Sequence, residues 1–290
     1  MRPAVVCNPS VVDDIDQLRK AISVRCATDP LWFETTPEDP GAGQIRQALD
    51  AGADLVLVCG GDGTVAACAG ALAGTDVALA LVPVGTGNLL ARNLDLPLEI
   101  EPALDVAFGP GRRQLDVLEA GDRRFVVMAG LGFDAALIRD TDDDSKSKAG
   151  WPAYLAGAAR AVRGTPHVQF TISVDGAAAV RRRALGVLVG NVGQVQGGLR
   201  LLPDAQPDDG VIDVGVLMPR TRRDWPVLVL RILRGRPDGG RQAEILRGRH
   251  VEISVDQMVP TQYDGEYAGE AAQLSVRALS RAITVCVPPS

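Results

Sequence analysis

Two glycine-rich loops, each lying between an apolar strand and a helical segment, constrain the fold of this chain more than any other feature. The first, Gly60–Gly63 (GGDG), follows the apolar run Asp54–Cys59 and precedes a helical pattern over Thr64–Leu72. The second, Gly85–Asn88 (GTGN), follows another apolar run over Val77–Val82. Unbroken apolar strands that alternate with helices through short connections are typical of a parallel α/β sheet.

The same alternation fills the rest of the first third of the chain. Pro3–Cys7 is a strand-like apolar run, and a helical stretch with acidic residues in its first turn follows over Asp13–Ile22. Gln44–Ala51 is a second amphipathic helix. A cluster of helix and strand breakers over Phe108–Gly111 is typical of a linker. We therefore predict a Rossmann-like parallel α/β domain over residues 1–110.

Beyond this linker, short strands replace the alternation of strands and helices. Asp175-Gly176 lies between two of them and predicts a hairpin turn. Two helices, Trp151–Val162 and Arg222–Leu233, interrupt the series. The predicted strands are Gln114–Glu119, Phe125–Ala129, Val168–Val174, Arg183–Val189, Val211–Leu217, Val251–Val255, Gln273–Val276 and Ile283–Val287. We predict a largely antiparallel, β-sandwich-like domain over residues 111–280. The sequence leaves open whether the final strand, in residues 281–290, belongs to this domain or returns to the first.

Composition excludes several classes of function. The formal net charge is −6 and aromatic residues make up only 4% of the chain, so we expect no nucleic-acid partner. The only two histidines, His167 and His250, lie far apart and outside the glycine-rich loops, which argues against a histidine-ligated metal and against a Ser-His-Asp triad. None of the three lysines completes a GxxxxGK[ST] pattern, so a P-loop is absent.

Cysteine usage and hydropathy bear on the compartment. The five cysteines are scattered and odd in number, so we interpret them as small buried apolar residues in a reducing environment. No basic-then-apolar leader opens the sequence, and no apolar run approaches the roughly 20 residues that a membrane-spanning helix needs. We expect a cytoplasmic protein, an expectation that is compatible with work at a membrane surface.

The two loops have the composition of a phosphate-binding site. Open α/β sheets bind ligands at the carboxyl ends of their strands, so loops that follow successive strands should face one crevice. Glycines let the backbone approach a phosphate, and the following helix offers free N–H groups. The carboxylate of Asp62 would be costly beside an anion unless a cation such as Mg²⁺ bridged the two. The alternative for GGDG alone is a plain turn in which Asp62 caps the helix.

Six motifs resemble, in order, those of the diacylglycerol kinase catalytic family, which includes soluble bacterial lipid kinases and sphingosine kinases. They are GGDGTV (60–65), PVGTGNLLARNL (83–94), AGLGFDA (129–135), GNVGQVQGG (190–198), PDDGVIDV (207–214) and DGE (264–266). The resemblance implies an ATP- and Mg²⁺-dependent kinase that phosphorylates a lipid hydroxyl, with diacylglycerol as acceptor and phosphatidic acid as product. A sphingoid base or another lipid is the alternative acceptor.

The resemblance also implies a set of nucleotide contacts. The residues that match the family's ATP-binding positions are Asn8, Thr36 (or its neighbour Thr35), Gly60, Gly61, Asp62, Gly63, Thr64, Thr86 and Asn88. The family's NPxxG loop has the sequence Asn8-Pro9-Ser10-Val11-Val12 in this chain and lacks the usual glycine.

Catalytic roles follow from the same resemblance. Asp62 and Asp134 match carboxylates of the catalytic Mg²⁺ network. Glu266 matches the general base that accepts the proton of the lipid hydroxyl as phosphate is transferred. Because Asp-Gly is a favoured turn dipeptide, a solvated hairpin turn is the alternative for Asp264-Gly265-Glu266.

A second cation site is implied at Asp208-Asp209-Gly210-Val211. It would use the carboxylate of Asp209 with the backbone carbonyls of Gln206 and Val211, and oxygen ligands of this kind suit Mg²⁺ or Ca²⁺ in a structural role. The alternative is an acidic β-turn that enters a strand.

Departures from the family pattern leave other functions open. Many members carry a glutamate three residues after the GGDGT threonine, where this chain has Ala67. Together with the missing NPxxG glycine, Ala67 favours, as one alternative, a nucleotide- or lipid-binding protein that has lost activity. NAD kinase also carries GGDGT and is a further alternative. A homodimer is left open.

A basic segment suggests a membrane surface as partner without reference to any family. Residues 220–249 contain nine arginines against three acidic residues, and the apolar stretch Trp225–Leu233 lies among them. Apolar residues beside a basic cluster suit peripheral docking on an anionic bilayer. The alternative is a solvated helix face that covers the sheet.

Overall fold

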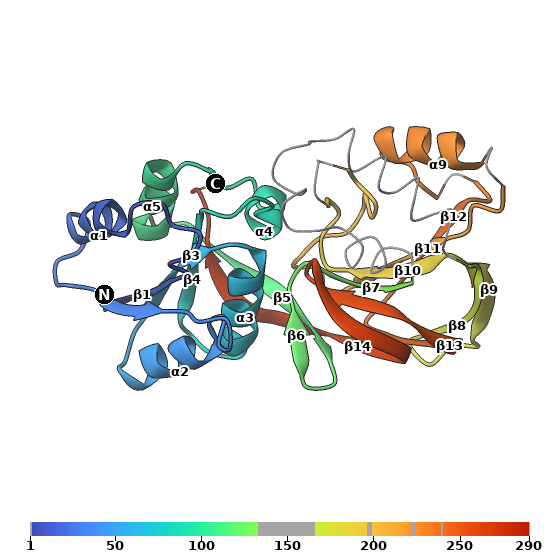
Figure 1. Ribbon diagram of the computed structural model, residues 1–290, viewed down its shortest axis with the longest axis horizontal. Helices are drawn as coiled ribbons and strands as arrows, with labels where there is room; N and C mark the ends of the chain where they lie inside the picture. The colour runs from blue at the N-terminus through green and yellow to red at the C-terminus, as the bar shows by residue number, and fades with distance from the viewer. Residues whose placement is uncertain (1, 133–165, 196–198, 222–223, 239, 290) are drawn as a thin grey trace. The chain divides into compact units, whose positions relative to one another are not determined.

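The computed structural model describes residues 2–132, 166–195, 199–221, 224–238 and 240–289, and Figure 1 shows the arrangement of their elements. The chain forms two compact units. Unit 1 contains Met1–Val117, Arg124–Val126 and Leu279–Ser290, and unit 2 contains Leu118–Arg123 and Val127–Ala278. The helix predicted over Trp151–Val162 lies outside the described residues.

Unit 1 is built on a parallel sheet. Its strands are β1 (Pro3–Cys7), β2 (Leu31–Glu34), β3 (Leu55–Gly60), β4 (Ala78–Pro83) and the end of β14 (Glu266–Cys286). They lie in the order β2-β1-β3-β4-β14, and each neighbouring pair runs parallel. The last strand of the chain therefore pairs with β4, where Thr284 lies opposite Ala78. The predicted parallel α/β architecture is confirmed.

Helices cover both faces of this sheet (Figure 1). α1 (Ile15–Ser23) and α5 (Ile100–Phe108) pack on one face, and α2 (Ala42–Asp50) and α3 (Asp62–Leu72) cover the other. Successive strand residues point to opposite faces, so burial on both sides requires every strand position to be apolar, as in β3 and β4. Four of the five cysteines are buried in unit 1, as expected for small apolar residues.

Unit 2 is antiparallel. Its main elements are β7 (Met128–Gly132), β8 (Val168–Val174), β9 (Val180–Ala184), β10 (Gly186–Gly190), β11 (Ile212–Leu217), α9 (Asp224–Leu233), β12 (Ala243–Gly248) and β13 (His250–Tyr263). β5 (Arg112–Ala120) and β6 (Arg123–Phe125) connect the two units along the chain. β12, β11, β10, β7 and β13 pair in that order, and β13 also pairs with β8 and β14. The predicted β-sandwich-like class is confirmed.

β13 changes partners along its length. Its first half, Val251–Val255, pairs with β8, whereas Thr261–Tyr263 pairs with β7. The register against β14 shifts between Ser254 and Val259, as at a β-bulge, and a bulge bends a strand so that it can pass from one group of strands to another.

Some predicted elements differ from the observed ones. The single strand predicted over Arg183–Val189 is wrong, because the chain leaves β9, which pairs with β8, and enters β10, which pairs with β7 and β11. β2, β12 and α5 were not predicted. In α5, Pro102 lies in the first turn, where the missing N–H costs nothing, so it does not stop the helix. No helix among the described residues is both long and apolar enough to cross a bilayer.

Candidate active site

The first glycine-rich loop makes a tight turn from β3 into α3. Gly61 is the N-cap, so the motif residues Asp62, Gly63 and Thr64 already belong to the first turn of the helix. A side chain at Gly60 would meet Thr64, whose Cβ lies 2.7 Å from the position of an added Cβ. The free N–H groups at the start of this 11-residue helix therefore open directly onto the loop.

The second loop is closed by its own asparagine. Asn88 has a left-handed backbone conformation (φ 50°) and caps α4 (Leu89–Asn93). Its Oδ1 accepts a bond from the N–H of Gly85 (3.1 Å), and its Nδ2 donates to the carbonyl of Gly85 (2.7 Å). These two bonds fix the loop as a ring and leave Thr86 exposed at its tip.

The two loops contact each other directly. A Cβ added to Gly85 would lie 2.5 Å from Cα of Gly61, so only glycine permits this approach. Oδ1 of Asp62 accepts a bond from the N–H of Leu89 at 2.6 Å, and its Oδ2 lies against Gly87. The two loops that follow β3 and β4, where we predicted a crevice, are therefore held together by this hydrogen bond and by backbone contact.

The contact between the loops exposes the Asp62 carboxylate to opposing influences on its pKa. Burial raises the pKa of this carboxyl above its ordinary value, while bonds from the N–H groups of Leu89 and Asn88 oppose the rise. The charge of Arg92 also favours the ionised form, and Nε of Arg92 donates to the carbonyl of Gly87 at 2.8 Å. Asp62 thus caps the helix that follows the other loop, a contact that differs from the alternative of a plain turn, in which it would cap its own helix.

Asn8 and the threonines lie at the ends of the neighbouring strands. Nδ2 of Asn8 donates to Oγ1 of the buried Thr64 at 3.4 Å, which connects the end of β1 to α3. Thr35 is buried and bonded through its N–H to the carbonyl of Cys7, whereas Thr36 is exposed and its Oγ1 accepts a bond from the N–H of Asp39. Of the two threonines, Thr36 is the one that a ligand could reach.

In unit 2, Asp264 and Gly265 form a two-residue turn between β13 and β14. Both have positive φ (47° and 87°), as a type I′ hairpin turn requires, and Tyr263 pairs with Glu266 across it. Glu266 is the first residue of β14 and is exposed. The hairpin geometry expected for Asp-Gly is present, and it presents the candidate base to solvent.

The predicted second cation site is engaged by an arginine. Oδ1 of Asp209 accepts a bond from the N–H of Val211 (2.9 Å), and its Oδ2 accepts one from Nη2 of Arg247 (3.1 Å). Nε of Arg247 forms an ion pair with the buried Asp213 at 3.0 Å, without the alignment of a hydrogen bond. Burial raises the pKa of Asp213 to about 6, and the positive charge of Arg247 opposes the rise. These carboxylates already share a cation, so they do not fit a divalent metal well.

The predicted catalytic cation site lies only partly within the described residues. Asp134 and the segment 196–198 of the GNVGQVQGG motif lie outside the described residues. The described part of the chain contains no group of three or more His, Cys, Asp or Glu side chains that could hold a metal. Asp62 fits as one ligand, because a carboxylate oxygen that accepts an N–H bond keeps a second lone pair.

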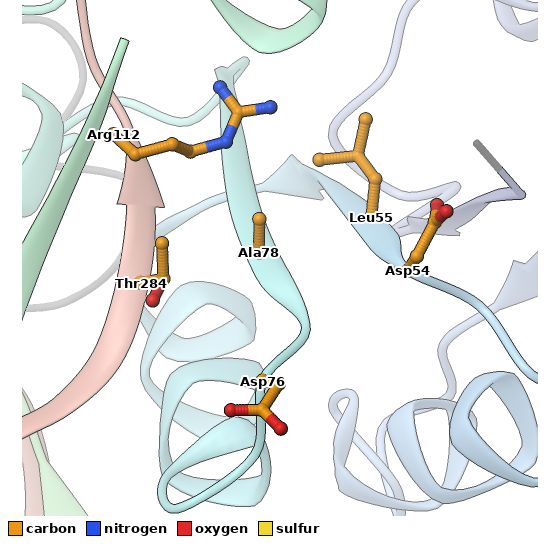
Figure 2. A pocket seen from close by; sticks show the side chains of 6 residues that line it. All are labelled: Asp54, Leu55, Asp76, Ala78, Arg112 and Thr284. Atoms are coloured by element: carbon orange, nitrogen blue, oxygen red, sulfur yellow. The ribbon is translucent and has the colours of Figure 1, made fainter. Parts of the chain in front are cut away.

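A cavity in unit 1 lies away from these loops. It has a volume of about 400 Å³ and lies where β3 and β4 begin, with Asp54, Asp76 and Arg112 among its lining residues (Figure 2). Arg112 donates to the carbonyls of Gly109 and Gly111. Because ligands of open α/β sheets bind at the carboxyl ends of the strands, we assign the site to the loops and not to this cavity.

Comparison with known proteins identifies the family. A profile described as "Diacylglycerol kinase catalytic domain" matches residues 12–120, and one described as "YegS C-terminal NAD kinase beta sandwich-like domain" matches residues 126–287. The chain belongs to this family of lipid kinases. The predicted family and enzyme class, a phosphotransferase, are thereby confirmed.

Individual relatives of this lipid kinase agree. A Chromohalobacter salexigens protein named "Probable lipid kinase YegS-like" is 32% identical over 87% of this chain and 83% of its own length. A Bacillus subtilis protein named "Diacylglycerol kinase" is 27% identical, with 74% and 72% of the two chains covered.

Solved structures share the fold. A diacylglycerol kinase from Bacillus anthracis str. Sterne matches with a TM-score of 0.81 at 22% identity, over 99% of this chain and 97% of its own. An NAD kinase from Archaeoglobus fulgidus in complex with ATP matches with a TM-score of 0.55 at 12% identity, over 99% and 93%.

Sequence reasoning missed several residues of the lipid kinase that the structure brings to the motifs. Arg92 and the N–H of Leu89 belong to the PVGTGNLLARNL motif, but nothing in the sequence shows that they contact Asp62. Arg247 stood only as one member of a basic segment. Asp264 was considered only as a turn residue, although an aspartate at the start of an Asp-Gly turn is a known acceptor for backbone N–H groups.

Proposed function

We propose that this kinase transfers the γ-phosphate of ATP to the hydroxyl of diacylglycerol, giving phosphatidic acid, and that it requires Mg²⁺. The observation that carries the proposal is the direct contact between the two glycine-rich loops at the carboxyl ends of β3 and β4. The name of the Bacillus subtilis relative supports the acceptor, and the ATP complex of the NAD kinase with a similar fold supports the donor.

The loops supply the phosphate site. The start of α3 offers N–H groups and the positive end of a helix dipole to the phosphates, and Gly60–Gly63 lets the backbone approach them. Asn8, Thr36, Thr86 and Asn88 contact the rest of the nucleotide. Bound Mg²⁺, held by Asp62 and Asp134, would neutralise charge on the phosphates.

Glu266 then acts as the general base. Its carboxylate accepts the proton of the lipid hydroxyl as the new P–O bond forms, while the bond from the γ-phosphorus to the bridging oxygen breaks and ADP leaves. An exposed carboxylate on a rigid turn suits this role, because a general base must reach its substrate in a fixed geometry.

Incubation with γ-labelled ATP and separate vesicles that contain diacylglycerol, ceramide or a sphingoid base tests the proposal. We expect labelled phosphatidic acid, and its absence together with another labelled lipid would replace the acceptor. Glu266→Gln should lower the rate at least about 100-fold. Glu270→Gln is the matched control, because Glu270 is also an exposed carboxylate of β14 and its substitution should leave the rate unchanged. A wild-type rate in Glu266→Gln would remove it as the base.

The partner surface in this proposal is an anionic bilayer, and α9 is the docking element. Val227 and Leu230 are 41% and 46% exposed, one turn apart on the side of α9 away from the buried Leu228. Arg234 follows on the same side and is exposed. Apolar side chains beside cationic ones can insert into the headgroup region while the arginines meet anionic lipid.

A further inference from the structure

The turn that precedes Glu266 is hydrogen-bonded to the start of β7 through the buried carboxylate of Asp264. Asp264 is 3% exposed, and its Oδ1 accepts bonds from the consecutive N–H groups of Val127 (2.9 Å) and Met128 (2.8 Å). The N–H of Asp264 donates back to the carbonyl of Met128 at 2.7 Å. Three hydrogen bonds therefore join this single residue to a strand start that lies more than 130 positions away in sequence.

The other N–H of the turn is also satisfied inside the protein. The N–H of Gly265 donates to Oε1 of Gln262 at 2.9 Å, and Gln262 is fully buried. Gln262 pairs with Gly130 of β7, so it is fixed in the same pair of strands. The backbone that leads into Glu266 is thus held on both sides, by Asp264 and by Gln262.

We infer that Asp264 and Gln262 are positioning residues that fix the orientation of Glu266. The inference rests on the proposed role of Glu266 as general base. A general base contributes only within a narrow range of distance and direction, and displacement by about 1 Å can cost as much as 100-fold in rate. An exposed glutamate on a free hairpin would sample many orientations. The hydrogen bonds of Asp264 to β7 reduce this range because they fix the backbone that precedes Glu266.

A second turn in the same unit separates this role from ordinary turn stability. Asp175-Gly176 has the same conformation (φ 51° and 72°), and Oδ1 of Asp175 accepts bonds from the consecutive N–H groups of Arg249 and His250, both at 2.8 Å. The N–H of Asp175 donates back to the carbonyl of His250 at 2.8 Å. The residue two positions after Asp175 is Ala177, where the Asp264 turn has Glu266.

Asp264→Ala and Asp175→Ala are therefore variants of one hydrogen-bonding motif, which is buried at Asp264 and exposed at Asp175. Both remove a carboxylate that accepts two backbone N–H bonds, so both should lower the unfolding temperature. Only Asp264→Ala should lower kcat, by between about 10- and 100-fold, with the KM for ATP within about twofold of wild type. Asp264→Asn, which keeps an oxygen able to accept both bonds, should retain most of the activity. Equal effects of the two alanine variants on kcat would overturn the inference.

A double substitution tests whether Asp264 acts through Glu266. Asp264→Ala should lower the residual rate of Glu266→Gln by less than about twofold, because the base that it positions is already absent. A full additional loss would mean that Asp264 acts by another route and would overturn the inference. Hydrogen exchange at the Val127, Met128 and Gly265 amides gives a readout without catalysis, and it should rise in Asp264→Ala. If Glu266→Gln is inactive and Asp264→Ala is fully active, the positioning role of Asp264 is rejected and Glu266 remains the proposed base. If Glu266→Gln is fully active, the role of Glu266 as general base is rejected.

Discussion

Oδ1 of Asp62 accepts a hydrogen bond from the main-chain N–H of Leu89 at 2.6 Å, and this contact joins the first glycine-rich loop to the helix that follows the second. The two residues are 27 positions apart in sequence. An acidic residue expected to face phosphate and metal therefore also holds the two walls of the proposed site at a fixed separation.

Two Asp62 variants distinguish the hydrogen bond that Asp62 accepts from Leu89 from the negative charge of its carboxylate. Asp62→Asn keeps an acceptor for the N–H of Leu89, so it should unfold near the wild-type temperature, yet it should lose phosphoryl transfer because the charge is gone. Asp62→Ala leaves that N–H without its acceptor and should cost about 1–3 kcal/mol of stability as well. Urea unfolding and labelled-ATP assays measure the two effects. Wild-type stability in Asp62→Ala would show that the hydrogen bond between Leu89 and Asp62 contributes nothing to folding stability.

The contact between the loops predicts an asymmetric response to alanine. A Cβ at Gly85 would lie 2.5 Å from Cα of Gly61, and backbone cannot move aside cheaply, so Gly85→Ala should cost about 1–3 kcal/mol. The reverse change, Gly61→Ala, meets Gly85 at an ordinary 3.8 Å with a negative φ, so its folding stability should fall by less than about 1 kcal/mol, the cost of alanine in place of glycine at an N-cap. Urea unfolding of the two variants checks the order, and equal losses would contradict the loop geometry.

Local patterns were sufficient to predict the architecture. Unbroken apolar runs such as Leu55–Gly60 require burial on both faces, which only helices on both sides of a parallel sheet provide. The positions of the two glycine-rich loops followed from the same argument, because parallel strands end at one edge. α5 was missed because Pro102 resembles a helix breaker unless the start of the helix is already known.

Contacts between distant segments could not be predicted. The bonds of Asp264 to Val127 and Met128 span 137 and 136 positions, and no periodicity encodes such a pairing. The partner change of β13 depends on a bulge within an apparently continuous strand pattern. The sequence therefore indicated candidate residues for the chemistry but not the residues that hold these candidates in place.

The arginine at the PDDGVIDV motif predicts that folding does not depend on a divalent cation there. Arg247 already contacts Asp209 and Asp213, so the shift of the unfolding temperature caused by EDTA or Mg²⁺ should differ by less than about 1 °C between the wild type and Asp209→Asn. Arg247→Gln removes the shared positive charge and should make stability responsive to Mg²⁺ or Ca²⁺. Arg249→Gln, two residues along, is the control. A loss of stability with EDTA that occurs in the wild type and not in Asp209→Asn would instead support a cation held by Asp209.

Asp213 predicts how stability changes with pH. Its folded-state pKa of about 6 exceeds the ordinary value near 4 of an unfolded chain, so the folded state binds the proton more tightly. Its contribution to stability is therefore full below about pH 4 and is lost as the pH rises through 6. Asp213→Asn cannot ionise, so it should gain about 1–3 kcal/mol over wild type at pH 8 and nothing at pH 4. Urea unfolding at both values measures the difference, and an equal change at both would contradict the shift.

The exposed side of α9 predicts a defect confined to membranes. Val227→Glu with Leu230→Glu places two charges where apolar side chains would enter the headgroup region. Binding to vesicles that contain phosphatidylglycerol should therefore fall at least about 10-fold, and phosphorylation of vesicle-borne lipid should fall with it. Activity on a dispersed short-chain diacylglycerol should remain, because α9 carries none of the residues proposed for catalysis. Val24→Glu is the control, since Val24 is 73% exposed in unit 1 and lies outside the basic segment. Wild-type vesicle binding in the double variant, or an equal loss in Val24→Glu, would mean that α9 is only a solvated cover of the sheet.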